Sequence, residues 1–412
     1  EPGNFFQDSA LVIGGSDPID IQASSTQPTL LKNAIETNTG LVIFAETQQF
    51  LLHTDSDTLT PDTGKVSNIS TYRYNAATQP VSLGTTIGFL DTAGVNGRFF
   101  EMYDIRREGE PQIVEQNKIA PRLLPDDLAI LTNSRENNTV FISRSGQKNI
   151  WGFRYFNNGE TRVQSAWFKW DLPFDFLNMF VIGNKLFLVS STYNLLYIPL
   201  RQFLESPNAN QDDIWGSGGG FSYAGDSIHL DAHKTVSVAS NAYDGTHTTI
   251  TTTFAGTVSQ LAAVNTNTGE VFMEDTALRN GNTYKFLGDF SGDSVVMGIL
   301  FDFKAVIPRI FVKKKVGEFT TSDVTASLTV QRLRFSFGPV GQIDINIKRV
   351  GKPDMNIQYE STPMDHYDAD ELPFVNEKIQ NVPVYERNKN CLITLSSTHP
   401  GPAQLFSMTW EG

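Results

Sequence analysis

Short apolar runs alternate with polar turns along most of the chain, and they recur in pairs. Each pair joins two runs rich in Val, Ile, Phe, Tyr and Thr through a turn of Gly, Asn, Asp or Ser, which is the pattern of a β-hairpin. Four such hairpins are predicted, at residues 40–54, 84–105, 138–157 and 179–200. A further strand, RVQSAWFKW, follows the third hairpin. The pattern predicts an all-β fold.

The predicted hairpins begin at residues 40, 84, 138 and 179, so their separations are 44, 54 and 41 residues. A period of about 40–50 residues with about four short strands in each unit is typical of β-propeller blades. Consecutive hairpins of a β-sandwich are the alternative. We favour a β-propeller-like domain because the spacing repeats.

Helical periodicity is scarce, and the three candidate helices are short, at residues 29–37, 125–133 and 200–205. After about residue 205 a polar, Gly-rich stretch containing GSGGG appears, either natural or engineered, followed by a Thr-rich β stretch. From residue 307 onward, cleaner alternating strands predict a smaller β-sandwich- or barrel-like domain. The predicted organisation is a propeller-like domain at 1–205, a connecting β region at 206–300 and a β-rich domain at 301–412.

One strand of the last domain has no wholly apolar face under strict alternation. In LTVQRLRFSF, Leu328 and Val330 would share a face with Arg332 and Arg334. We therefore expect one side of this strand to meet water or another subunit.

The composition narrows the classes of partner. The formal net charge is −13, which repels nucleic-acid phosphates and anionic lipid. No run approaches the roughly 18 apolar residues of a membrane span, so no membrane insertion is expected. The single cysteine, Cys391, excludes an intrachain disulfide and a C-x-x-C metal knuckle. The start at EPGNFF, without Met, predicts a fragment of a longer polypeptide.

No catalytic motif is present: the nucleophile elbow G-x-S-x-G, the P-loop and the dinucleotide fingerprint are all missing from the sequence. His229 and His233 have the i, i+4 spacing of a helical zinc site, but their segment is not helical and two loop histidines are the better interpretation. Asp365, Asp368, Asp370 and Glu371 offer oxygen ligands for Ca²⁺, although a solvated acidic loop is favoured. We therefore expect no enzyme activity, no cofactor and no metal, while a glycosidase pair of carboxylates stays open.

A run of three lysines, Lys313–Lys315, lies on a strand that reads as a sheet edge. Lysines on an edge strand oppose edge-to-edge aggregation, and we favour that interpretation. An inter-subunit or nucleic-acid contact is the functional alternative.

Three tryptophans, Trp151, Trp167 and Trp170, form the most conspicuous aromatic cluster. Residues three apart in a strand lie on opposite faces, so Trp167 and Trp170 cannot make one flat platform for a sugar or a base. We predict that all three are packing residues within and between blades.

Long runs of the chain resemble one family. They include GLVIFAETQQFLLHTDSDTLTPDTGKVSNISTYRY, NNTVFISRSGQKNIWGFRYFNNGETRVQSAWFKWDLP and the final AQLFSMTWEG. These runs resemble the tail nozzle proteins, or tail tubular proteins B, of short-tailed phages of the autographivirus type, most like those of cyanophages. The resemblance is dense over about residues 1–200 and thinner afterwards.

The resemblance implies a propeller-like region with additional β domains, located in the virion as part of the phage tail. It also implies six copies in a ring below an adaptor ring, continuing the DNA channel, with tail fibres docking nearby. The predicted function is a structural nozzle subunit that lets genomic DNA pass without tight binding. The alternative is a receptor- or glycan-binding tail module, or a polysaccharide depolymerase, for which Trp215, Tyr223 and Tyr367 are exposed aromatic candidates.

Overall fold

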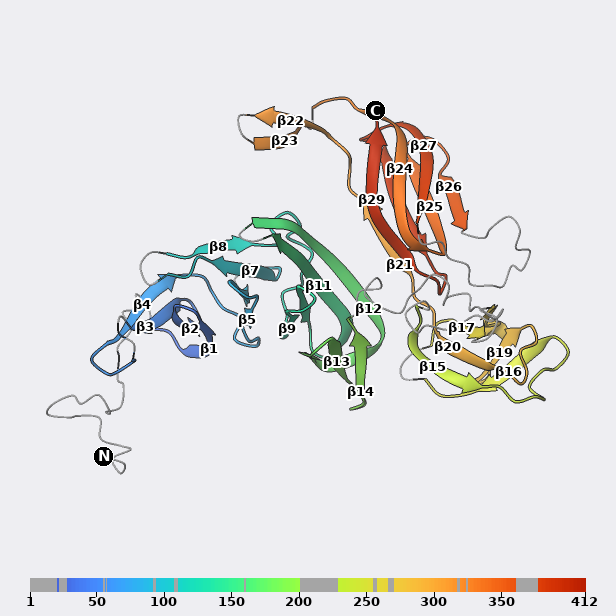
Figure 1. The fold of residues 1–412 in the computed structure, drawn as a ribbon, viewed down its shortest axis with the longest axis horizontal. Coiled ribbons are helices and arrows are strands. Elements are labelled where there is room, and N and C mark those ends of the chain that lie inside the picture. Colours follow the sequence, from blue (N-terminus) through green and yellow to red (C-terminus); the bar gives the residue numbers. More distant parts are fainter. Residues whose placement is uncertain are drawn as a thin grey trace. The chain divides into compact units, whose positions relative to one another are not determined.

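The computed structural model describes residues 21, 28–54, 56, 58–91, 94–106, 110–158, 161–200, 229–254, 258–265, 270–316, 319–323, 325–360 and 377–412. All strand ladders among these residues are antiparallel, so the predicted all-β class is confirmed (Figure 1). The predicted helix at 29–37 is wrong, because Leu31–Thr37 forms the strand β1. In the described part of the chain the helical structure is one 3₁₀ turn, η2 (Thr276–Leu278).

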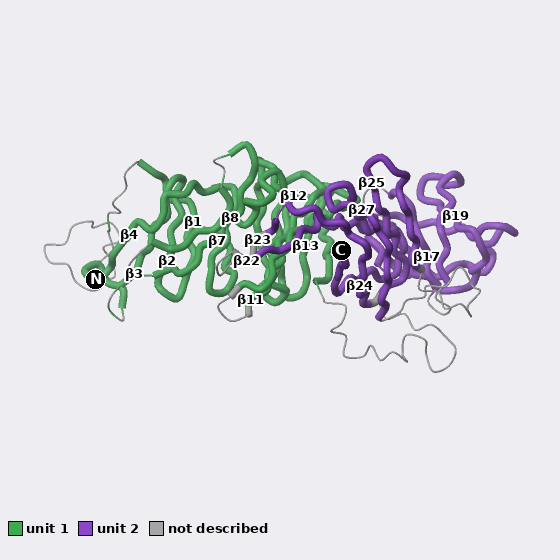
Figure 2. The backbone as a smooth tube through the Cα atoms, turned by 90° about the horizontal axis from the view of Figure 1, so that it is seen from above, with its two compact units in different colours: residues 1–202 green, residues 203–412 purple. Residues whose placement is uncertain are grey.

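The chain divides into two compact units, residues 1–202 and 203–412 (Figure 2). The division falls close to the end of the predicted first domain at residue 205. The finer, three-domain division stays a prediction.

The described residues of unit 1 form three sheets built as meanders, in which consecutive strands are neighbours. The predicted hairpins at 40–54, 84–105 and 138–157 are the pairs β2–β3, β6–β7 and β10–β11. The first sheet contains β1 (Leu31–Thr37), β2 (Gly40–Ala45), β3 (Gln49–Thr54) and β4 (Gly64–Ser70). The second contains β5 (Val81–Ser82), β6 (Ile87–Asp91), β7 (Arg98–Tyr103) and β8 (Gln112–Glu115). The third contains β9 (Ile130–Ser134), β10 (Thr139–Ser143), β11 (Gln147–Asn158), β12 (Thr161–Ile182), β13 (Lys185–Ser190) and β14 (Leu195–Pro199).

The second sheet buries apolar side chains on both faces, which makes it an inner layer of unit 1. Side chains alternate along its strands, so Phe89 and Phe100 point to one side and Leu90 and Phe99 to the other. Phe89 and Phe100 share a core with the first sheet. Leu90 and Phe99 share another core with the third sheet. The three sheets are therefore stacked in sequence order, each on the next.

The third sheet also encloses a core of its own. The strand β12 is 22 residues long and curved, and it pairs with β11 through its first part and with β13 through its last part (Figure 1). Residues on one face of both parts form a single cluster in which Phe141, Phe176 and Leu186 are almost completely buried. Because all members of this cluster come from residues 129–200, the sheet covers its own core by curving. The predicted third and fourth hairpins thus belong to one sheet, since β12 is continuous between them.

Unit 2 contains two groups of sheets with separate cores. In the first group, a four-stranded sheet and a two-stranded sheet share a core around Phe286 and Phe290. The four strands are β15 (Asp231–Ser237), β20 (Ser294–Ile299), β17 (Leu261–Asn265) and β18 (Val271–Met273), and the two are β16 (His247–Thr251) and β19 (Thr283–Leu287).

The second group consists of two sheets that face each other across one apolar core, with a separate hairpin. One sheet contains β21 (Phe303–Ile307), β28 (Cys391–Ser397), β25 (Gln342–Arg349) and β26 (Met355–Glu360). The other contains β27 (Lys378–Arg387), β24 (Thr329–Val340) and β29 (Ala403–Glu411). The hairpin consists of β22 (Val312–Val316) and β23 (Phe319–Asp323).

The strand β24 has one wholly apolar face, contrary to the expectation from strict alternation. A β-bulge between Val330 and Arg332 shifts the register by one residue. As a result Val330 and Leu333 both enter the core, while Arg332 and Arg334 stay exposed.

Gly152 on β11 provides the space for an aromatic ring, and this gives a first prediction. A Cβ atom at Gly152 would lie 1.9 Å from the ring of Phe168, its partner on β12. We expect Gly152→Ala to lower the free energy of unfolding by about 2–3 kcal/mol, because the ring must leave its packed position. Chemical denaturation measures the loss. In a Phe168→Ala background the same substitution should cost little, and an equal cost in both backgrounds would contradict the explanation.

Candidate functional site

The predicted tryptophan cluster lies on β11 and β12 and is divided between two cores. Trp151 is 5% exposed in the core between the second and third sheets. The guanidinium of Arg144 and the ammonium of Lys169 each lie 5.8 Å from its ring centre. Both cations therefore lie over a ring that is otherwise buried, within the range of a cation–π contact.

Trp167 and Trp170 lie on opposite faces of β12, as strand alternation predicts. Trp167 packs at 4.9 Å, between ring centres, on Phe153, and its Nε1 donates to the carbonyl of Gln116 at 3.2 Å. Trp170 packs at 5.7 Å on Phe141 in the core of the third sheet. Each ring touches different partners, so the two do not form one platform. Their contribution to stability stays a prediction.

The strongest polar contact near these rings is a buried ion pair between Glu101 on β7 and Arg162 on β12. The guanidinium is bidentate, with Nη1 donating to Oε2 at 2.5 Å and Nη2 to Oε1 at 2.8 Å. Glu101 is 0% exposed. Thr86 donates to its Oε1 at 2.6 Å and Gln116 to its Oε2 at 2.9 Å, so both carboxylate oxygens are satisfied twice. A fully hydrogen-bonded pair of this kind is the form in which a buried carboxylate is tolerated.

Aromatic rings enclose the cation of this pair. The guanidinium carbon of Arg162 lies 4.9 Å from the ring centre of Tyr155, 5.7 Å from that of Tyr103 and 5.8 Å from that of Phe153. Burial, reinforced by the charge of Glu101, raises the pKa of Tyr155 to about 12 and also raises the pKa of Tyr103. Burial opposes the charge of Arg162, but the hydrogen bonds and charge of Glu101 raise its pKa overall. Both phenols therefore stay neutral and the guanidinium stays charged at any physiological pH.

Sequence reasoning missed this pair. Its members are 61 residues apart and lie in different sheets. The strand sequence RFFEMY hinted at a buried carboxylate, because Glu101 lies between the apolar residues Phe100 and Met102. A carboxylate at such a position requires a buried partner, but the sequence does not tell which of the many basic residues it is.

A second bidentate ion pair between a buried glutamate and an arginine occurs in unit 2. Arg279 donates to both carboxylate oxygens of Glu274, at 2.6 and 2.5 Å, and to the carbonyls of Val258 and Ser259, each at 2.8 Å. Glu274 also accepts from the backbone N–H of Leu261 at 3.0 Å. The pair joins the start of β17 to the segment after β18.

The candidate metal ligands do not come together in the described part of the chain, where no group of three or more His, Cys, Asp or Glu lies close enough to hold a metal. His233 lies on β15 rather than in a loop, with its Nδ1 3.1 Å from the carbonyl oxygen of Leu230. Burial raises the pKa of the neighbouring Asp231 to about 6. The acidic stretch 361–373, the GSGGG segment and the aromatic candidates Trp215, Tyr223 and Tyr367 lie outside the described residues.

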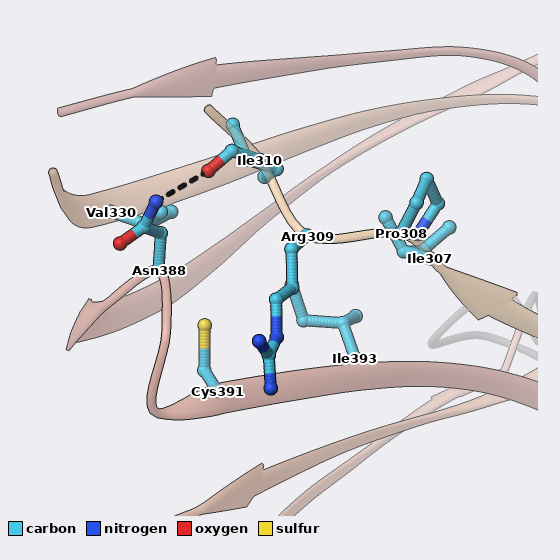
Figure 3. A pocket seen from close by; sticks show the side chains of 8 residues that line it. All are labelled: Ile307, Pro308, Arg309, Ile310, Val330, Asn388, Cys391 and Ile393. Carbon is cyan, nitrogen blue, oxygen red and sulfur yellow. Dashed lines mark hydrogen bonds between the residues drawn. The ribbon is translucent and has the colours of Figure 1, made fainter. Parts of the chain in front are cut away.

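One shallow pocket in unit 2 has a volume of about 10 Å³, space for about a single water molecule (Figure 3). Its wall is fixed by Asn388, whose Nδ2 donates to the carbonyl of Ile310 at 2.8 Å. Cys391 also lines it, and burial raises the pKa of this thiol. A higher pKa lowers the thiolate fraction, so the geometry does not provide an activated nucleophile here.

Comparison with known proteins defines the class of the chain. Over 170 residues it is 22% identical to "Tail tubular protein gp12" of Escherichia phage T7, an alignment that covers 41% of this chain and 21% of that protein. The aligned part thus spans about a fifth of the length of the curated relative. This likeness indicates a structural protein of a phage tail. The chain belongs to the bacteriophage nozzle protein family, whose model matches residues 1–412. It is a structural tail component and part of the virion.

Solved structures show only distant likenesses. The AfRom2 CNH domain has 8% identity and a TM-score of 0.26, with 66% of this chain and 95% of that chain covered. An exo-beta-1,3-galactanase from Phanerochaete chrysosporium has 8% identity and a TM-score of 0.21, with 89% and 76% covered. Such TM-scores define no common fold. In the described residues no helix is long and apolar enough to cross a membrane.

The packing of Trp170 gives a second prediction. Trp170→Ala should lower the free energy of unfolding by about 3 kcal/mol, because it removes the ring that packs on Phe141 and Phe168. Trp410→Ala is the matched control, since that ring is 37% exposed on the edge strand β29, and it should cost about 1 kcal/mol or less. Denaturant titration measures both. An unchanged stability in Trp170→Ala would make this tryptophan a surface residue and refute its packing role.

The buried ion pair gives a third prediction. Arg162→Met leaves the Glu101 carboxylate buried without its cation, and should destabilise unit 1 by about 3–5 kcal/mol. Adding Glu101→Leu should recover most of that loss, because the stranded charge is gone. Asp127→Asn, which breaks the exposed pair with Arg144, is the control and should cost about 0.5 kcal/mol. A double variant as unstable as Arg162→Met alone would show that lost packing, rather than the unpaired charge, causes the damage.

Proposed function

We propose that this chain is part of a nozzle subunit that surrounds the DNA exit channel of a short-tailed phage. In this proposal six copies form a ring, an adaptor ring and tail fibres are its neighbours, and the chain catalyses no reaction. The observation that carries the proposal is the match to the bacteriophage nozzle family along residues 1–412. The curated relative is itself described as a tail tubular protein.

The proposed fold of unit 1 is an incomplete β-propeller, followed in unit 2 by a sandwich-like pair of sheets. Stacking of meander sheets in sequence order supports the propeller, because blades pack on their neighbours in chain order. In the sandwich-like pair, β21-β28-β25-β26 and β27-β24-β29 share one core. The proposed roles of Trp151, Trp167 and Trp170 are packing within and between these layers.

A partly exposed aromatic row on the last sheet of unit 1 supports assembly with another layer. Phe180, Phe187 and Tyr197 are direct cross-strand partners on β12, β13 and β14, with ring centres 5.5 and 5.9 Å apart. Comparable aromatic pairs fill the inner cores, such as Phe44–Phe89 at 5.3 Å and Phe99–Phe153 at 5.6 Å. Tyr197, however, is 56% exposed. The row therefore has the make-up of a sheet-to-sheet interface on a face that meets solvent in the isolated chain.

The charge of the chain supports a conduit rather than a DNA-binding protein. A net charge of −13 opposes tight binding of a polyanion, so DNA would slide along the wall without being held. No comparable feature of the described residues favours the glycan-binding alternative, whose aromatic candidates lie outside them.

A fourth prediction tests the ring directly. Electron microscopy of the full-length protein in purified tails should show six copies of this chain around a central pore. A single copy, or a ring without a passage wide enough for duplex DNA, would refute the nozzle proposal. A glycan array with a reducing-end assay on the same protein should show neither binding nor turnover.

The aromatic row offers a variant for the same experiment. Tyr197→Ser should change the free energy of unfolding by less than about 1 kcal/mol in the isolated chain, because that side chain is 56% exposed there, while reducing the yield of assembled rings. A large loss of stability in the isolated chain would show that the chain itself covers the row.

A further inference from the structure

The hairpin β22–β23 is separate from the sheets around it. Its two strands pair with each other and with no other strand of the described chain (Figure 1). It lies between β21 and β24, yet of its residues with described burial none belongs to a core, and Val312 is 37% exposed. A lone two-stranded ribbon is marginally stable in water, so its order benefits from a surface to rest on.

The ribbon carries three adjacent cations. Lys313, Lys314 and Lys315 are all exposed, and they alternate between the two faces of β22. Within the described residues none of the three ammonium groups has a carboxylate at ion-pair distance. The nearby Asp323 lies within the electrostatic reach of Lys314, but its carboxylate is held mainly by hydrogen bonds from Thr325 and Ala326. The three lysines thus form a local cluster of positive charge, on a hairpin whose sequence also contains Glu318 and Asp323 and in a chain whose net charge is −13.

The charges decide which partner fits. Lysines along β22 oppose the addition of another strand at its edge, so contact occurs through side chains and not through a shared ladder. Two copies of an acidic chain repel each other at long range, as each repels a DNA duplex, but at contact distance the lysines of one copy are attracted by carboxylates of the other. A second copy of this chain supplies that acidic surface and is present wherever the first one is.

We propose that the β22–β23 hairpin is an inter-subunit arm, in which Lys313–Lys315 dock on carboxylates of a neighbouring copy of this chain. The proposal rests on the multi-copy assembly proposed above, and it adds the contact that joins one copy to the next. It also predicts a salt-sensitive assembly, because exposed ion pairs are screened by salt.

Sedimentation of the 412-residue chain tests the arm. The unaltered chain should self-associate at low salt and dissociate as salt is raised. The triple variant Lys313→Glu, Lys314→Glu, Lys315→Glu should weaken the association by roughly tenfold or more, since three favourable pairs become repulsive. The matched control reverses Lys304, Lys348 and Lys389 to Glu, which are exposed lysines of the same unit outside the hairpin, and it should associate nearly as the unaltered chain does. A triple Lys→Arg variant in the hairpin should keep the association.

Zero-length carbodiimide cross-linking of mixed light and ¹⁵N-labelled chains identifies the contact. Cross-links from Lys313, Lys314 or Lys315 should join a light chain to a heavy one, at Asp or Glu residues. Cross-links confined to single chains, or a triple Glu variant that associates like the control, would overturn the arm while leaving a ring held by other surfaces intact. A chain that stays monomeric at low salt overturns it as well.

A duplex DNA probe tests whether the hairpin binds DNA rather than a neighbouring copy of the chain. In the proposal, the fluorescence anisotropy of a labelled 20-base-pair duplex is the same with the unaltered chain and with the triple Glu variant. Binding that disappears in the triple variant, together with unchanged self-association, would assign the hairpin to DNA and overturn the proposal.

Discussion

The buried contact between Glu101 and Arg162 determines how the layers of unit 1 fit together. Aromatic interfaces are adaptable, because rings pack acceptably in several offsets, but a bidentate ion pair has one good geometry. Glu101 is completely buried, so any displacement of one sheet along the other would strand a charge in an apolar interior. We expect the pair to contribute less to net stability than to the choice of one register between the two sheets.

The same type of ion pair recurs where Arg279 binds Glu274, although there it joins neighbouring segments around β17 and β18 of one sheet. In both pairs the arginine reaches in from a partly exposed position, while the carboxylate is wholly buried. The exposed part of the guanidinium retains some hydration, which lowers the cost of burying the pair. Arginine suits this role better than lysine, because its planar fork satisfies both carboxylate oxygens at once.

Local patterns in the sequence predicted the hairpins, because alternation and turn residues act within about 20 positions. The same reasoning assigned Trp167 and Trp170 to opposite faces of β12. It failed where pairing overrides local periodicity: residues 31–37 have helix-like spacing, but Ile35 pairs with Val42 in a sheet. It also failed at β24, where a bulge moves Leu333 into the core. Sequence alone could not pair Glu101 with Arg162, because that contact exists only once two separate sheets have stacked.

The continuity of β12 has a mechanical meaning. Its 22 residues follow a contour of roughly 70 Å and belong to both parts of the curved third sheet. A pull on either part is carried to the other by one uninterrupted backbone rather than through a loop. The continuous strand therefore couples the two parts of the third sheet mechanically.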